Sequence, residues 1–462
     1  MTDPWRWTAT RIAEAVRARE VSCREVIESH LARIETTNPS VNAVTRILAG
    51  EALAIAESHD RRLAAGERLG PIAGVPITVK ENVDLAGSPT TMGVQALAAD
   101  LPLGDAPHVA QLKAAGAIPI ARTNLPDYAL RWHTENALHG LTRNPWDANL
   151  TCGGSSGGDA AAIATGMTPI GLGNDIAGSV RWPSQCCATC ALKPTRGRVP
   201  RTRMTATPVP RSMASQVFAV HGPMARSVED LWLAITNMSG YSPHDPGWVP
   251  APLVGPPEQE PIRVALVTDP DGLGIEPAVE AAVRAAGNAL TGAGYTVEEV
   301  PPPAFERTIE LYWQCLGDLT TASNPDHVSD SFARYRDAFA PFYPEVMGSR
   351  SPDPWAERLP IATEWSRWMD EYPLILAPVA TRSAFPVGYD EDPANALDWL
   401  HAIRWIVAVN FLGLPAVALP TGIAGGIPQG VQVISRSFRE DLAIRAAKAI
   451  EDAVSTFTPI DP

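Results

Sequence analysis

Apolar residues recur along the chain in two patterns, helical spacing and short continuous runs, which alternate from one end to the other. Near the N-terminus, the capping box Ser22-x-x-Glu25 opens a helix whose apolar positions lie at helical spacing: Val26, Ile27, Leu31 and Ile34. Short apolar runs predict strands at residues 75–80, 118–120, 169–172, 263–267, 295–300, 374–378 and 430–434. Further helices are predicted at residues 106–115, 159–165, 279–290 and 441–454. This alternation predicts an α/β protein. The β-α-β passage over residues 263–300 indicates a return to the same sheet rather than a second domain.

Two segments interrupt this alternation. Residues 240–262 are rich in Pro and Gly and predict a surface linker. Residues 303–372 carry many aromatic side chains, which indicate either a helical cover over an apolar pocket or ordinary packing between helices. These aromatic residues are Trp313, Tyr335, Phe339, Phe342, Trp355, Trp365 and Trp368.

Composition narrows the class of protein. The chain has 462 residues and a formal net charge of −14, which argues against a nucleic-acid-binding surface. The sequence shows neither a charged-then-apolar leader nor an apolar run of about eighteen residues, so we expect a cytoplasmic protein without a membrane segment.

Six cysteines lack the spacing of a disulfide framework: Cys23, Cys152, Cys186, Cys187, Cys190 and Cys315. The pair Cys187-x-x-Cys190 has neither a second such pair nor a partner histidine, which a metal site would require. We therefore expect buried packing cysteines and no metal.

One stretch, residues 153–194, concentrates the candidate chemistry. Two Gly/Ser clusters, at residues 153–158 and 175–179, flank a short Ala-rich helix and an apolar strand. A Gly-rich turn that ends in serine can place a nucleophile beside backbone N–H groups that stabilise an oxyanion. A serine nucleophile also needs a base, and the stretch contains no histidine.

This stretch resembles the amidase signature family. The family pattern is GGSSGG, then G-x-G-x-D-x-G-G-S-x-R-x-P, then Lys-Pro and Gly-Arg. Its counterparts here are residues 153–158, residues 171–183, Lys193-Pro194 and Gly197-Arg198. The resemblance implies one α/β domain over residues 1–462, with a central mixed, mostly parallel β-sheet covered by helices on both faces. It also implies an N-terminal helical wrap over residues 1–65 and a signature core over residues 70–235.

The resemblance further implies a triad of Ser179 as nucleophile, Ser155 on a cis peptide bond and Lys80 as base. Lys80 ends the apolar run V-P-I-T-V-K. A lysine has an ordinary pKa of about 10.4, and burial lowers that pKa toward the range of a working base. Ser156 is expected to support Ser155 through its hydroxyl group. The expected oxyanion hole consists of the N–H groups of Ile176, Ala177, Gly178 and Ser179.

Two features of the loop around Ser179 carry separate expectations. Asp175 and Arg181 flank the nucleophile and should pair to hold its loop. Ala177, Ala188 and Ala191 stand where the family usually has glycine. Alanine keeps its N–H group, so the oxyanion hole survives if φ is negative at these positions, with less room near the acyl group.

The blocks T-N-x-P at residues 123–126 and N-P-W-D at residues 144–147 also match the family. Between these blocks, Tyr128 and Trp132 lie on a segment that lines the substrate pocket in relatives. We expect these two residues and Gly154 to contact substrate, although core packing explains Trp132 nearly as well.

The resulting hypothesis is a serine hydrolase that cleaves C–N bonds of hydrophobic aryl or alkyl amides or anilides through an acyl-enzyme. Esters and carbamates, including urethanes, share the tetrahedral intermediate. Small-molecule amides are the only expected partners, no cofactor is expected, and the protein is expected to be a monomer or homodimer.

Two alternatives remain. An A-type component of a glutamine-dependent amidotransferase would act with a partner protein, but Ile403 stands where such relatives place an acid. An α/β-hydrolase elbow would use Ser156 as nucleophile and His401 as base. That elbow requires an apolar strand directly before it, and residues 150–153 fit one poorly.

Overall fold

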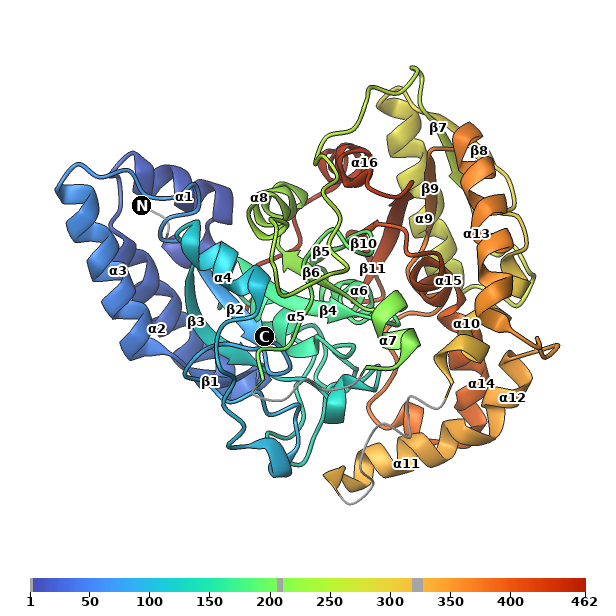
Figure 1. Ribbon diagram of the computed structural model, residues 1–462, viewed down its shortest axis with the longest axis horizontal. Helices are drawn as coiled ribbons and strands as arrows, with labels where there is room; N and C mark the ends of the chain where they lie inside the picture. The colour runs from blue at the N-terminus through green and yellow to red at the C-terminus, as the bar shows by residue number, and fades with distance from the viewer. Residues whose placement is uncertain (1–2, 206–210, 318–326) are drawn as a thin grey trace.

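A computed structural model describes residues 3–205, 211–317 and 327–462. One sheet of eleven strands runs through the molecule in the order β1-β3-β2-β4-β6-β5-β10-β11-β9-β7-β8 (Figure 1). The strands are β1 (Val44–Ile47), β2 (Pro76–Lys80), β3 (Ile118–Thr123), β4 (Ile170–Asp175), β5 (Cys190–Lys193), β6 (Val220–Ala225), β7 (Arg263–Leu266), β8 (Thr296–Glu299), β9 (Leu374–Pro378), β10 (Ala416–Ala424) and β11 (Ile427–Ser435). The predicted single α/β domain with a mixed sheet is confirmed.

The prediction that this sheet is mostly parallel is wrong. Strand β2 is parallel to β3 and β4, and β7 is parallel to β8 and β9, but the other six pairings between the described strands are antiparallel. The strands that the apolar pattern missed are β1, β5, β6 and β10, and all their pairings are antiparallel. The turn between β10 and β11 is the pair Gly425-Gly426, whose φ angles of 58° and 83° suit a tight hairpin.

Helices pack along the whole sheet. Helices α1–α3, which Figure 1 shows in blue, lie at the end of the sheet that carries β1, and α9 and α13 lie at the opposite end. The helices are α1 (Ala9–Arg17), α2 (Cys23–Val41), α3 (Ala49–Ala64), α4 (Pro107–Ala114), α5 (Gly157–Ala164), α6 (Arg181–Cys187), α7 (Met213–Phe218), α8 (Val228–Met238), α9 (Pro277–Gly292), α10 (Phe305–Leu316), α11 (Asp330–Phe339), α12 (Tyr343–Val346), α13 (Pro354–Glu371), α14 (Pro393–Ala402), α15 (Arg404–Leu412) and α16 (Glu440–Asp452).

Several local predictions can be checked directly. The capping box at α2 is formed, because Ser22 Oγ accepts from the Glu25 N–H and a Glu25 carboxylate oxygen accepts from the Ser22 N–H. All six cysteines are buried and unpaired, as expected. Residues 240–262 form no helix or strand, and the described part of residues 303–372 forms helices α10–α13. Among the described helices, none combines the length and the apolar character needed to cross a bilayer.

Candidate active site

Lys80 and two serines meet at the carboxyl end of β2, in the parallel part of the sheet. Lys80 is the last residue of β2, and Ser155 and Ser156 directly precede α5. Lys80 Nζ lies 2.7 Å from Ser155 Oγ, 2.9 Å from Ser156 Oγ and 3.2 Å from Asn174 Oδ1. The peptide bond between Gly154 and Ser155 is cis, as the resemblance predicts. The structure therefore brings three of the predicted residues into direct contact.

The lysine lies among buried carboxylates. Burial lowers the pKa of Lys80 to about 7, and the negative charges of Asp159 and Asp175 act against that decrease. Asp159 Oδ1 accepts from Thr78 Oγ1 at 3.0 Å and from Thr123 Oγ1 at 2.8 Å, whereas its Oδ2 is buried and has no hydrogen-bond partner among the described residues. Because Thr78 and Lys80 are two residues apart in β2, they face the same side of the sheet, toward α5.

Ser179 lies in the loop that follows β4. The N–H of Ser156 donates to the backbone oxygen of Ser179 at 3.0 Å, which joins the two serine segments. Asp175 and Arg181 form the predicted ion pair, with both side chains fully buried and 3.1 Å between Arg181 Nε and Asp175 Oδ2. Although burial acts to raise the pKa of Asp175, Arg181 lowers it to about 2. This ion pair ties the loop to α15 and β11 as well, because Arg181 also donates to Asn410 Oδ1 and Gln432 Oε1.

The predicted set of oxyanion donors changes at one position. The N–H of Gly178 donates to Asp175 Oδ1 at 2.8 Å, so it is already engaged within the loop. Gly178 has a φ of 89°, and a Cβ atom there would lie 2.6 Å from Ile406 Cγ2, so the position requires glycine. The N–H groups of Ile176, Ala177 and Ser179 therefore remain as the predicted oxyanion donors.

The three alanines that replace family glycines differ from one another in conformation. The φ angle of Ala177 is not positive, and Ala191 lies in β5. Ala188 has a φ of 54°, because it is the left-handed residue that ends α6. The condition of negative φ therefore holds for Ala177, which lies in the loop, and fails for Ala188.

An aromatic cavity opens onto Ser179. Trp132 and the helices α10–α12 supply most of its wall, together with Ile176 and Ala177 of the loop. The lining side chains include Leu130, Trp132, Tyr312, Trp313, Tyr335 and Met347. Of the aromatic residues expected to cover a pocket, Trp313 and Tyr335 line this cavity. Trp365 instead packs against Phe305 and Trp405.

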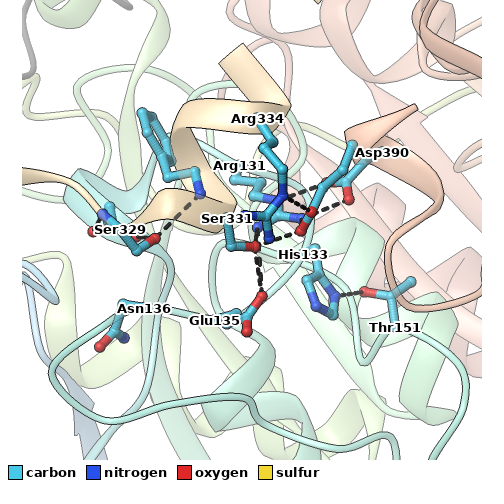
Figure 2. A network of polar contacts seen from close by, with 12 residues as sticks. Arg131, His133, Glu135, Asn136, Thr151, Ser329, Ser331, Arg334 and Asp390 are labelled. Atoms are coloured by element: carbon cyan, nitrogen blue, oxygen red, sulfur yellow. Dashed lines mark hydrogen bonds and ion pairs between the residues drawn. The ribbon is translucent and has the colours of Figure 1, made fainter. Parts of the chain in front are cut away.

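The segment that carries Trp132 is anchored by a buried ion-pair network (Figure 2). Arg131 donates from Nε and from one terminal nitrogen to Asp390, at 2.7 Å each, and its other terminal nitrogen donates to Ser331 Oγ at 2.6 Å. The side chains of Arg131 and Asp390 are fully buried. Figure 2 shows Arg131 pointing toward Ser331 of α11 and toward Asp390, so the network joins the predicted substrate segment to the helical cover.

Two predicted substrate contacts lie outside the aromatic cavity. Gly154 packs against the backbone of residues 131–133, where a Cβ atom on residue 154 would lie 2.5 Å from the Arg131 oxygen. Tyr128 lines a second, more polar cavity, which shares Ala129, Leu130 and Ile176 with the aromatic one. Trp132 is the predicted contact that lines the aromatic cavity.

Three residues of the site were not identified from the sequence. Asn174 stands inside the signature motif next to Asp175, and the alternation of β2 could have placed Thr78 on the same face as Lys80. Tyr312 lies 136 positions from Ile176 along the chain, yet its hydroxyl donates to the Ile176 backbone oxygen. No local pattern marks this tyrosine.

Comparisons with known proteins agree with this architecture. The profile of the Amidase family matches residues 25–444. The chain is 42% identical to an indoleacetamide hydrolase of Bradyrhizobium diazoefficiens, over 97% of this chain and 86% of that protein. It is 33% identical to the A-type component of the glutamyl-tRNA(Gln) amidotransferase of Salinispora arenicola, over 99% of both chains. The crystal structure of a bacterial aryl acylamidase of the amidase signature family matches with a TM-score of 0.80 and 25% identity, over 97% of both chains.

The chain therefore belongs to the amidase family, and the protein is a hydrolase that acts on amides. The α/β-hydrolase alternative is wrong, because the family is a different one and residues 150 and 151 form only isolated bridges before Ser156. The expected cytoplasmic location and the expected monomer or homodimer stay predictions.

Proposed function

We propose that the protein hydrolyses amides of aryl-substituted carboxylic acids, with arylacetamides as the leading class. The observation that carries this proposal is the aromatic cavity at Ser179, whose walls are mostly indole, phenol and aliphatic groups. Such a cavity favours a flat apolar acyl group, because it offers few polar partners. The similarity to an indoleacetamide hydrolase supports the same class of substrate.

In the proposed reaction Ser179 is the nucleophile and Lys80 is the base. A neutral amine has two N–H groups and one lone pair, and Lys80 Nζ has three neighbours within 3.2 Å. It can thus donate to Ser156 and Asn174 and accept the proton of Ser155. Ser155 takes the proton of Ser179 as Ser179 Oγ attacks the amide carbon, and the N–H groups of Ile176, Ala177 and Ser179 stabilise the oxyanion.

Collapse of the tetrahedral intermediate breaks the C–N bond and releases the amine, which receives the proton held by Lys80. Water then attacks the acyl carbon while its proton passes through Ser155 to Lys80. The bond between Ser179 Oγ and the acyl carbon breaks, Ser179 regains its proton, and the carboxylic acid is released. The polar cavity that adjoins the aromatic one at Leu130 and Ile176 is the proposed location of the amine half. Anilides, esters and carbamates pass through the same intermediate, so we propose them as secondary substrates.

The first test combines active-site labelling with a substrate panel. Treatment with a fluorophosphonate, followed by peptide mapping, should give an adduct on Ser179 in the wild-type protein and none in Lys80→Ala. The panel compares phenylacetamide and indole-3-acetamide with acetamide, acetanilide, phenyl acetate and a phenyl carbamate. The arylacetamides should have the highest kcat/KM. An adduct on Ser156, or equal rates for acetamide and phenylacetamide, would contradict the proposal.

The glutamine-dependent alternative makes an opposite prediction. Its support is the similarity to the A-type component of an amidotransferase over nearly the whole chain. Against it, the acid that such relatives carry is replaced by Ile403, which is fully buried. Arg131 lines the aromatic cavity, but its guanidinium group is already paired with Asp390, so it is a poor partner for the α-carboxylate of glutamine. Release of ammonia from glutamine faster than from phenylacetamide would favour this alternative.

A further inference from the structure

The loop before Ser179 is held by two aromatic side chains of the cavity wall. Trp132 Nε1 donates to the backbone oxygen of Ala177 at 2.7 Å, and the Tyr312 hydroxyl donates to the backbone oxygen of Ile176 at 2.9 Å. Two consecutive carbonyl groups of the loop are therefore bound by residues that also line the aromatic cavity.

These contacts fix the direction of N–H groups as well as of carbonyl groups. In a trans peptide the C=O and the following N–H point in opposite directions within one rigid plane. The peptide between Ala177 and Gly178 is held from both ends, because Trp132 binds its oxygen and Asp175 binds its N–H. In the peptide between Ile176 and Ala177, Tyr312 binds the oxygen. The direction of the Ala177 N–H therefore depends on the Tyr312 hydroxyl.

We propose that Tyr312 is a positioning residue that aims the Ala177 N–H at the oxyanion formed during amide hydrolysis. The inference rests on the proposed function of Ser179 and the loop. Tyr312 belongs to α10 in the helical cover, so one side chain both shapes the acyl pocket and orients an oxyanion donor. Its ring is fully buried and packs against Phe218 and Trp313, with 5.2 Å between ring centroids in each case. Those ring contacts remain when only the hydroxyl is removed.

The test uses Tyr312→Phe in the full-length protein, with Tyr372→Phe as the matched control. Tyr372 is also buried, but it lies outside the aromatic cavity, and its hydroxyl accepts from Arg263 and donates to Glu298 rather than to the loop. For phenylacetamide, Tyr312→Phe should lower kcat about 10-fold or more with KM within about two-fold of the wild type, because the donor acts on the transition state. The control should keep both constants, and equal thermal midpoints would show that both variants fold.

Inhibitors supply a second readout that a purely structural role would not change. Phenylacetaldehyde mimics the intermediate: Ser179 Oγ bonds to its carbonyl carbon, the C=O π bond breaks, and the Ser179 proton passes through Ser155 to Lys80, leaving an oxyanion. Ethylbenzene has the same aryl group and no oxygen, so it can fill the cavity without using the oxyanion donors. Tyr312→Phe should bind the aldehyde about 10-fold more weakly and ethylbenzene as tightly as the wild type does.

Two results would overturn the inference. One is wild-type kcat and aldehyde affinity in Tyr312→Phe. The other is an equal loss of affinity for the aldehyde and ethylbenzene, because this would mean that the hydroxyl shapes the pocket rather than the oxyanion hole. A wild-type protein that hydrolyses no arylacetamide would instead refute the proposed function, so the two failures are distinguishable.

Discussion

The two sides of Ser179 are built differently. On one side, Lys80, Ser155 and Ser156 form a closed polar cluster in which each group has a hydrogen-bond partner within the core. On the other side, an aromatic cavity is walled by Trp132 and by helices α10–α12 of the cover. In the proposed mechanism, the groups on the polar side move protons and the surface on the aromatic side selects the acyl group. This separation implies that substitutions on the two sides should change different measured quantities.

The largest expected effect is at Ser179, the proposed nucleophile, which belongs to both sides. Ser179→Ala should lower kcat/KM for phenylacetamide by about 10⁴-fold or more, because the acyl-enzyme cannot form. Ser156→Ala should lower it only about 10-fold, because Ser156 provides a hydrogen bond rather than the attacking oxygen. Steady-state kinetics on both purified variants tests the order. A greater loss in Ser156→Ala would mean that the two serines have been assigned the wrong roles.

The ion pair beneath the loop should affect stability more than chemistry on either side. Arg181→Ala leaves the Asp175 carboxylate buried without its charge partner, so it should reduce the free energy of unfolding by about 3–5 kcal/mol. The control Arg284→Ala breaks ion pairs of a half-exposed arginine with Glu280 and Glu299, which should cost less than about 1 kcal/mol. Urea denaturation measures both. Similar losses would show that burial of the Asp175–Arg181 pair does not matter.

On the aromatic side, Met347→Trp should change the substrate range without changing the proton transfers. Met347 lines the cavity, and a larger side chain there should exclude an aryl group. The kcat/KM for phenylacetamide should fall about 10- to 200-fold relative to acetamide. Met213→Trp, at an exposed methionine of α7, should change neither value. A uniform loss for both substrates would break the proposed separation of the two sides.

The two sides also differ in how well the sequence predicts them. The polar side comes from a contiguous motif and one strand end, so the resemblance of these segments to a family pattern is enough to predict that Lys80 lies beside Ser155 and Ser156. The aromatic side depends on residues far apart in the sequence, such as Trp132 and Tyr312, whose meeting no local periodicity indicates. The same limit applies to the sheet. Length does not explain the missed strands, because β1 and β5 have four residues each, as do the predicted strands β7 and β8. All pairings of the missed strands are antiparallel, and such pairings need no helix between the strands, so an alternation of strands and helices does not mark them.

The smallest expected effect concerns the polar side alone. With Lys80 as a neutral base of pKa about 7, kcat/KM should rise as the pH increases through 7 and level off above it. Asp159→Asn removes a buried negative charge that favours the protonated lysine, so the pKa of Lys80 should fall and the acid limb should move by about one pH unit to lower pH. The amide of asparagine can still accept from Thr78 and Thr123, which keeps the local packing. Met347→Trp should leave the acid limb where it is in the wild type, and a pH profile that moves in both variants would show that the two sides are coupled.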